Sequence, residues 1–192
     1  MQFFRNLKKS ADAELMLRIG KGDQEAFSEL YARYSGRLLN FFFRMLDKDL
    51  AKAEDFMHDL FLKIIENPGR YDPRRCFDTW VFHIAYNMCK NEYNRMAVRN
   101  EYTSSLSKEE PETGERAGDR HDFHRFSEAL DVHLNRLDER HRMVFLLRYQ
   151  QEMPIRGIAE ILGCPEGTVK SRLFVAIKTL SGKLNVFDPK IN

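Results

Sequence analysis

The segment from Met153 to Leu184 constrains the fold of this 192-residue chain more than any other segment does. Four apolar residues at helical spacing define one face of a short first helix: Ile155, Ile158, Ala159 and Leu162. Gly163 and Pro165 then end this helix, because glycine tolerates left-handed backbone and proline cannot extend a helix. We expect Thr168 to cap a second helix, so the segment predicts a helix-turn-helix.

The second helix of this pair has an apolar stripe and a polar face. The stripe consists of Val169, Leu173, Ala176, Leu180 and Leu184. The opposite face carries Lys170, Ser171, Phe174, Val175 and Lys178. Cations and a hydroxyl group suit phosphates and base edges, and large apolar groups on this face suit thymine methyl groups in a DNA major groove. The alternative is a helical hairpin with a solvated basic face, since the motif is also a common packing unit.

This segment resembles the C-terminal promoter-binding domain of the extracytoplasmic-function sigma factors of bacterial RNA polymerase. The matching residues are Leu137-Asp138, Arg142 to Leu147 and Ile158 to Leu173. The start of the second helix also resembles output domains of response regulators and other activators. Motifs in the N-terminal half of the chain are therefore needed to distinguish a sigma factor from a response regulator or another activator.

The resemblance implies that the second helix reads the -35 promoter element. Carried over by position, the DNA-binding residues are Thr168, Lys170, Ser171, Arg172, Phe174 and Lys178. Family members commonly have arginine where this chain has Val175 and Ile177. The loss of two cations should weaken phosphate binding and its dependence on salt.

Composition and local charge fit a folded protein with several charged surfaces. The hydrophobic content of 43%, with 12% aromatic residues, is sufficient for packed cores, and the net charge of +2 is small. Residues 70–100 and 154–184 each carry three more basic than acidic side chains, whereas residues 46–60 carry three more acidic ones. This distribution indicates two nucleic-acid surfaces and a third, different contact.

The cysteine content and the hydropathy indicate a protein of the reducing cytoplasm. Cys76, Cys89 and Cys164 have no C-x-x-C spacing, which argues against a disulfide framework or a zinc site. No apolar stretch approaches the roughly 18 to 20 residues that a membrane span needs. Residues 1–10 lack the continuous apolar core of a signal peptide.

The apolar spacing between about residues 10 and 100 is helical throughout, so we expect this half to be all-α. The first helices are outlined by Leu15, Ile19, Phe27, Leu30, Tyr31 and Tyr34, and the next helix by Leu38, Phe41, Phe42 and Met45. A further helix should run from Ala53 to Asn67. The last should run from Thr79 to about Val98, with Asp78 as its cap.

A polar segment, residues 101–122, separates this half from the C-terminal helices. It has seven acidic against three basic side chains among serine, glycine and proline, which predicts a flexible linker. A second domain should resume near Phe123, with Phe126, Leu130, Leu134 and Leu137 on its first helical stripe. Because such a linker supplies little interface, we expect the two domains to move independently.

The helix predicted over residues 53–67 has an acidic face next to apolar residues. Phe56, Leu60 and Ile64 lie on one side, and Asp55, His58, Asp59 and Lys63 lie toward another. It resembles the helix by which sigma factors bind the clamp of core polymerase, with His58 and Asp59 in place of the usual Gln and Glu. The resemblance implies that core RNA polymerase binds Asp55, His58, Asp59, Phe61 and Lys63. Without this resemblance, the charged side of the helix would be better interpreted as a solvated face.

The next segment, from Tyr71 to Asn87, joins a basic loop to an aromatic-rich helix. Cations with interleaved rings suit single-stranded DNA, because rings stack on unpaired bases while arginine neutralises phosphate. Taken alone, the stripe of Phe77, Trp80, Ile84 and Met88 indicates a buried core instead. In the sigma factors that it resembles, the loop captures a flipped base of the melted -10 element and the helix reads its upstream edge. The resemblance implies -10 contacts by Arg74, Arg75, Phe77, Trp80, His83, Asn87, Lys90 and Asn91.

Enzyme interpretations are weak. Glu54 and His58 lie one helical turn apart and could share a metal, and His-Asp dipeptides occur at residues 58–59 and 121–122. A helical hydrolase site needs further ligands with supporting partners, and the chain has neither a phosphate-binding glycine loop nor a nucleophile elbow. We therefore expect no catalytic residue, no metal and no cofactor.

Two motifs in the order that the family requires predict an all-α sigma factor with two helical domains joined by a flexible linker. Residues 10–100 should bind core polymerase and -10 DNA, residues 101–122 should form the linker, and residues 123–186 should form the helix-turn-helix domain for -35 DNA. The expected partners are core RNA polymerase, promoter DNA and, for regulation, an anti-sigma factor. The alternative is a helix-turn-helix activator or repressor with a helical sensing or dimerisation domain.

Overall fold

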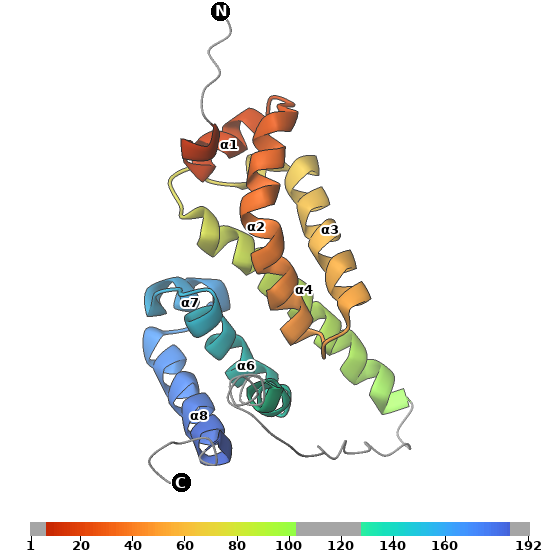
Figure 1. Cartoon of the computed structure of the whole chain (residues 1–192), viewed down its shortest axis with the longest axis vertical. Helices are drawn as coiled ribbons and strands as arrows, with labels where there is room; N and C mark the ends of the chain where they lie inside the picture. Colours follow the sequence, from red (N-terminus) through yellow and green to blue (C-terminus); the bar gives the residue numbers. More distant parts are fainter. Residues whose placement is uncertain (1–6, 103–127, 185–192) are drawn as a thin grey trace, which may run out of the picture.

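The computed structural model describes residues 7–102 and 128–184, and every regular element in these two ranges is helical (Figure 1). The first range contains the 3-10 turn η1 (Leu7–Lys9), the helices α1 (Asp12–Ile19), α2 (Gln24–Met45) and α3 (Leu50–Glu66), the turn η2 (Pro68–Arg70) and the helix α4 (Phe77–Tyr102). The second contains a helix over residues 128–135, then α6 (Glu139–Phe145), the π-helical turn η3 (Leu146–Gln150), α7 (Ile155–Leu162) and α8 (Glu166–Leu184). The predicted all-α fold is confirmed.

Aspartate side chains fix the starts of three helices. Asp23 caps α2 by accepting a hydrogen bond from the backbone N–H of Ala26 at 3.1 Å, and Asp49 and Asp138 cap α3 and α6 in the same manner. The backbone hydrogen bond, together with the Arg18 guanidinium, holds the pKa of Asp23 below its usual range. These caps satisfy N–H groups that have no partner inside the helix.

Four helices differ from their predicted boundaries, and α3 begins at Leu50 rather than at Ala53. α2 is one continuous helix, where the apolar pattern indicated a break after Tyr34. α4 begins at Phe77, so Asp78 lies in the first turn and forms an ion pair with Arg37 at 2.6 Å instead of capping the helix. α8 begins two residues before Thr168, which also lies in a first turn rather than at a cap.

The predicted linker lies outside the described residues, except for residues 101 and 102, which form the end of α4. Phe123 and Phe126, the first residues predicted for the second domain, also lie outside them. The helix over residues 128–135 contains Leu134, which is 1% exposed, and Leu137 just beyond it is also buried. The predicted apolar stripe is thus confirmed for Leu134 and Leu137.

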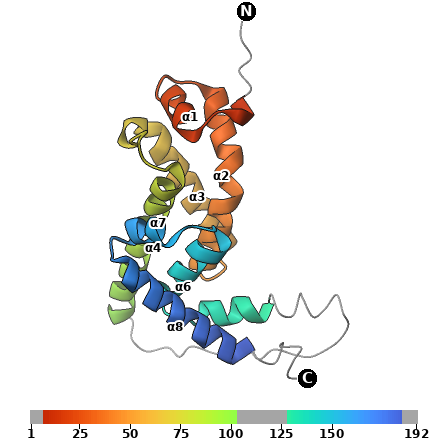
Figure 2. The same ribbon diagram turned by 90° about the vertical axis from the view of Figure 1, so that its left-hand side faces the viewer.

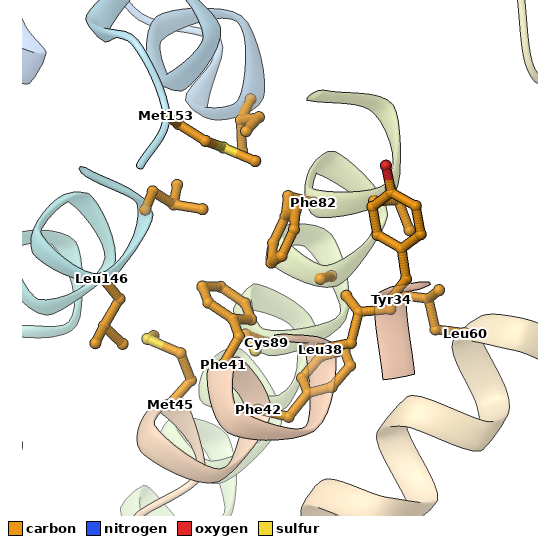
Figure 3. Close-up of a cluster of buried hydrophobic side chains, with 14 of the residues drawn as sticks. Tyr34, Leu38, Phe41, Phe42, Met45, Leu60, Phe82, Cys89, Leu146 and Met153 are labelled. Atoms are coloured by element: carbon orange, nitrogen blue, oxygen red, sulfur yellow. The ribbon is translucent and has the colours of Figure 1, made fainter. Parts of the chain in front are cut away.

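Helix α2 is the centre of the first half and packs against α1, α3 and α4. Figure 3 shows its buried aromatic side chains pointing into the core. Phe41 meets Phe82 of α4 edge to face with the ring centroids 5.4 Å apart, and Phe42 meets Phe56 of α3 at 5.6 Å. Such aromatic pairs add about 0.5–1.5 kcal/mol to the effect of burial alone. This packing fixes α3 and α4 relative to each other.

Helices α7 and α8 form the predicted helix-turn-helix. Gly163 ends α7 with φ 61° and ψ 39°, the left-handed conformation that the sequence indicated. Val169, Leu173, Ala176 and Leu180 are buried, as predicted for the apolar stripe of α8. α8 therefore keeps one face on its neighbours and turns the other to solvent.

The two halves pack against each other, whereas the sequence indicated little interface between them; that they move independently in solution stays a prediction. α7 lies against α4, and α6 contacts α2 (Figures 1 and 2). One cluster of buried side chains contains Phe41, Met45 and Phe82 of the first half with Leu146 and Met153 of the second (Figure 3). Buried side chains, which the composition of the linker cannot reveal, thus join the halves directly.

Leu38 is fully buried on α2, whereas Leu17 on α1 is 57% exposed. We expect Leu38→Ala to lower the free energy of unfolding by about 2–5 kcal/mol, because the shortened side chain leaves a cavity. Leu17→Ala should change it by less than about 0.5 kcal/mol. Urea unfolding followed by circular dichroism measures both values, and equal losses would contradict the core described above.

Candidate polymerase and nucleic-acid interfaces

The outward face of α3 is acidic with an apolar centre. Its predicted polymerase-binding residues Asp55, His58, Asp59 and Lys63 are all exposed. Leu62, which the prediction omitted, follows Asp55 by seven residues and Asp59 by three, so its 53% exposed side chain shares their face. Ile65 is 46% exposed near the end of the same helix. An exposed leucine among carboxylates is the signal by which this centre could have been found.

Phe61 does not belong to this exposed face. Its side chain is 3% exposed, with its ring centroid 4.6 Å from that of Tyr31 and 5.9 Å from that of Phe27. The predicted polymerase contact of Phe61 is therefore corrected, because the ring is enclosed by α2. Phe61 supports α3 from the inside.

The basic loop before α4 is ordered by local polar contacts. Asp72 accepts hydrogen bonds from Nε and Nη2 of Arg74, both at 3.0 Å, and this pairing lowers the pKa of the Asp72 carboxyl group. The Tyr71 hydroxyl donates to the backbone carbonyl oxygen of Arg75 at 2.7 Å. The side chains of Arg74 and Arg75 are nevertheless exposed. The loop thus holds its backbone in place while both cations face solvent.

A groove of about 660 Å³ lies beside this loop. It is lined by Arg74, Arg75, Cys76, Thr79, Trp80, His83 and Glu160, the last from α7. Trp80 is half-buried, so part of its ring surface is available for stacking with a base. Phe77 is 4% exposed and lies 4.9 Å from the ring of Tyr34. The predicted DNA contact of Phe77 is corrected for that reason, since its ring belongs to the core.

Helix α4 aligns the other candidates for -10 contacts on one side. His83, Asn87 and Lys90 follow Trp80 at intervals of three and four residues, and Asn91 lies one turn beyond Asn87. The amide nitrogen of Asn87 lies 3.3 Å from Nε2 of His83. His83, Lys90 and Asn91 are exposed and Asn87 is partly exposed. These side chains form a continuous polar stripe that leads away from the basic loop, and we call it the α4 stripe.

Helix α8 presents a mixed outward face. The exposed residues on it are Lys170, Ser171, Phe174, Val175 and Lys178. Phe174 is 66% exposed and Val175 is 43% exposed, so the Phe174 ring and the Val175 methyl groups are available for contact. Ile177, at 41%, is a further exposed apolar residue that the prediction did not assign to DNA.

Two predicted -35 residues lie away from this outward face. Thr168 is partly buried in the first turn of α8, where its carbonyl oxygen accepts a hydrogen bond from the Ser171 hydroxyl at 3.0 Å. Arg172 is also partly buried and lines a second cavity, of about 280 Å³, together with Lys90 and Tyr93 of α4. In this arrangement Arg172 faces the first half of the chain.

The weak metal-site interpretation gains no support from the geometry. In residues 7–102 and 128–184, no three His, Cys, Asp or Glu side chains lie close enough together to hold a metal ion. His121, of the second His-Asp pair, lies outside these ranges. Burial raises the pKa of the Cys89 thiol to about 12, which keeps it protonated and unreactive.

None of the helices in residues 7–102 and 128–184 combines the length and the apolarity that crossing a bilayer requires.

Comparison with known proteins shows the same two domains in the same order. The family Sigma-70 region 2 matches residues 30–98, and the family Sigma-70, region 4 matches residues 127–180. The ECF RNA polymerase sigma-E factor of Escherichia coli (strain K12) is 30% identical over 182 residues, which are 90% of this chain and 94% of the relative.

Two solved structures are similar in fold. CnrH in complex with the cytosolic domain of CnrY has a TM-score of 0.67 and 24% identity, covering 92% of this chain and 99% of that one. The sigma factor RpoE in complex with the anti-sigma factor NepR, from Bartonella quintana, has a TM-score of 0.65 and 21% identity, covering 83% and 97%.

The chain belongs to the extracytoplasmic-function (ECF) sigma factors of RNA polymerase. It is an alternative sigma factor, which binds core RNA polymerase and directs transcription initiation at specific promoters. The interpretation as a separate activator or repressor is not favoured, because region 2 is present as well as the helix-turn-helix.

The exposure of Phe174 separates DNA reading from packing on α8. We expect Phe174→Ala to leave the melting temperature nearly unchanged and to alter the preference for the -35 sequence, because the side chain is 66% exposed and truncation removes little buried area. Leu173→Ala, at a residue only 7% exposed, is the matched control and should lower the melting temperature. A stability loss for Phe174→Ala with unaltered -35 preference would remove Phe174 from the reading face.

Proposed function

We propose that three surfaces divide the work of this sigma factor. The outward face of α3 docks core RNA polymerase, the basic loop and the α4 stripe hold the melted -10 strand, and the outward face of α8 reads the -35 duplex. The observation that carries this proposal is that α3 lies on the side of α2 and α4 that is turned away from α7 and α8 (Figure 1). Polymerase docking and DNA reading therefore use different sides of the molecule.

Docking through α3 is supported by its combination of charge and apolar surface. Asp55 and Asp59 supply negative charge for a basic groove on the polymerase, and Leu62, one turn beyond Asp59 on the same face, supplies apolar area that becomes buried on contact. An apolar centre surrounded by charge is the usual anatomy of a protein interface. The complementary charges also favour correct orientation during association.

Strand capture beside α4 is supported by the pairing of cations with a partly exposed ring. Arg74 and Arg75 stand where phosphates of an unpaired strand could be neutralised, and Trp80 lies in the same groove. Base stacking tolerates any base, so sequence preference must come from hydrogen bonds. Asn87 and Asn91 can both donate and accept hydrogen bonds, which makes them the readers of the α4 stripe.

Duplex reading by α8 is supported by its outward face. Lys170 and Lys178 bracket Ser171, Phe174 and Val175 on a helix that follows the turn of a helix-turn-helix, the position of a recognition helix. With only these two lysines, phosphate contacts are few and apolar contacts contribute more of the selectivity. Thymine methyl groups are the part of the major groove that Phe174 and Val175 fit best.

Four further properties complete the proposal. The chain acts in the cytoplasm, where RNA polymerase works, and it catalyses no reaction of its own. No metal or cofactor takes part. The acidic segment of residues 101–122 separates the two DNA-reading domains along the chain and can mimic nucleic acid toward the polymerase channel.

The primary test is transcription from a defined promoter by purified core polymerase. Adding this chain should start transcripts at one position, whereas core polymerase alone should not. Under the same conditions an ordinary activator would require a separate sigma factor. Absence of any specific transcript over a panel of genomic promoters would contradict the proposed function.

Charge reversal on α3 tests the docking surface. Asp59→Lys places a cation against a basic groove, and the affinity for core polymerase should fall at least tenfold, corresponding to about 1.4 kcal/mol. Glu25→Lys, an equal charge change at the exposed start of α2, is the matched control and should have little effect. Fluorescence anisotropy of the labelled full chain measures both. Unchanged affinity for Asp59→Lys would remove α3 from the interface.

Loss of amides from the α4 stripe tests strand reading. The double variant Asn87→Ala/Asn91→Ala removes hydrogen-bonding groups without emptying the core, so promoter opening should fall while polymerase binding is retained. Asn40→Ala, at an exposed asparagine of α2, controls for the loss of a surface amide. Permanganate footprinting of the -10 region reports opening. Full activity of the double variant on every promoter would place -10 selection in the loop around Arg74 and Arg75 instead.

A further inference from the structure

Arg172 differs from the other arginines whose side chains are partly or fully buried. Within residues 7–102 and 128–184 its guanidinium forms no ion pair and no hydrogen bond. Arg142, by contrast, is 4% exposed and pairs with Asp47 at 3.2 Å. The other covered arginines that pair with a carboxylate are Arg18, Arg33, Arg37 and Arg44. A cation that loses hydration without gaining a partner is unfavourable, so the surroundings of Arg172 suit an anion from outside the chain.

Arg172 lines a cavity of about 280 Å³, which we call the Arg172 cavity. The helices α4, α6, α7 and α8 meet around it (Figure 2). Its volume lies near the lower limit for small-molecule sites, roughly 300 Å³. The cavity therefore suits a small ligand and excludes a nucleic-acid duplex.

Three cationic side chains converge on the Arg172 cavity from three helices. Lys90 belongs to α4, Arg140 to α6 and Arg172 to α8, and Glu139 is the one carboxylate of the lining. In the described part of the chain, the side chains of Lys90 and Arg140 also form no ion pair, and both are exposed to approaching solutes. A concave site with an excess of one charge attracts the opposite one. Guanidinium groups in particular bind phosphate through paired hydrogen bonds.

The remaining wall of the Arg172 cavity is partly aromatic. Tyr86 and Tyr93 lie seven residues apart on α4, and both line the cavity. The Tyr93 hydroxyl is engaged, because it donates to the backbone oxygen of Met45 and accepts from Arg142. The Tyr86 hydroxyl has no hydrogen bond among the described residues, and its side chain is partly exposed. Tyr86 thus offers both a ring face and a free hydroxyl group to a ligand.

We propose that the Arg172 cavity binds a small nucleoside phosphate. Its phosphate groups pair with the three cations, and its base lies against the ring of Tyr86. Proteins hold unpaired bases by stacking on aromatic rings and by hydrogen bonds to the base edges. Asn94, whose amide both donates and accepts, lines the same cavity and serves the second purpose. The inference goes beyond promoter recognition and does not depend on it, because the free chain alone binds the ligand.

Promoter DNA is a second source of phosphate. A duplex on the outward face of α8 would meet Lys170 and Lys178, whereas Arg172 lies away from that face. Arg140 belongs to neither of the surfaces proposed to read DNA. The convergence of Arg140 and Arg172 on one small cavity therefore favours a free nucleotide over a DNA backbone.

Calorimetric titration of the free full chain tests the site with defined probes. Adenosine diphosphate and guanosine diphosphate carry both parts of the proposed ligand, whereas adenosine and pyrophosphate each carry one. At least one of the two nucleotides should bind at one site per chain, at least tenfold more tightly than adenosine or pyrophosphate. Absence of binding by both nucleotides at millimolar concentration would overturn the site. Equal affinities for nucleotide and pyrophosphate would overturn the assignment to nucleoside phosphates.

Removal of one cation tests where the nucleotide binds. Arg140→Gln should lower the nucleotide affinity at least tenfold, because a charge-assisted contact to phosphate is lost. Arg136→Gln, the same change at an exposed arginine outside the cavity lining, is the matched control and should leave the affinity unchanged. Melting followed by circular dichroism verifies that both variants are folded. Undiminished affinity in the folded Arg140→Gln variant would overturn the site.

A change of the aromatic wall tests the position of the base. Tyr86→Leu should weaken nucleotide binding several-fold without altering the weak binding of pyrophosphate, since only the base is expected to contact this ring. Tyr86→Phe keeps the ring and should retain most of the nucleotide affinity. Equal nucleotide affinities of the leucine and phenylalanine variants would overturn stacking on Tyr86.

A duplex oligonucleotide separates the two sources of phosphate. Its affinity for the free chain should be the same with and without Arg140→Gln, because Arg140 is expected to serve the small ligand alone. If Arg140→Gln instead weakens duplex binding and the unaltered chain binds neither nucleotide, the cations serve DNA and the proposal is overturned.

Discussion

The aromatic packing around α2 is the interaction on which the rest of the structure depends. Phe41 and Phe42 enter the core side by side and contact α4 and α3, respectively, through Phe82 and Phe56. Both helices are therefore fixed by one buried element, with their polar faces turned outward. Sites on packed helices hold their geometry better than sites on loops, which suits the roles proposed for α3 and α4.

Much of this arrangement could be predicted from local sequence. The 3.6-residue period identified the exposed carboxylates of α3 and the buried stripe of α8, because each depends only on residues within one helix. Phe61 and Phe77 were wrongly assigned to contact surfaces, since resemblance transfers a position without showing which way its ring points. The Phe61 ring packs against Tyr31 and the Phe77 ring packs against Tyr34, and both tyrosines belong to α2. Contacts between separate helices are not contained in any single-helix pattern.

The junction between the halves could not be predicted for a related reason. Arg142 reads in the sequence as one of several arginines on a short helix, and its partners lie 95 and 49 residues earlier in the chain. Gly157 likewise reads as a weak position in an amphipathic helix. A Cβ atom placed there would lie 3.4 Å from the Thr79 hydroxyl oxygen of α4, a contact between helices that no single-helix pattern contains. A polar linker limits how far two domains can separate, but it carries no information on whether their surfaces fit.

The Arg142 ion pair contributes little to the strength of the contact between the halves. A buried ion pair gains little net stability, because the desolvation of both charges offsets most of their attraction. Arg142 regains full hydration when the halves part, and Asp47, whose side chain is already 62% exposed, loses little. The buried side chains of Met45, Phe82, Leu146 and Met153 belong to one apolar cluster that spans the two halves. The strength of the contact between the halves therefore depends more on these apolar side chains than on the Arg142 ion pair.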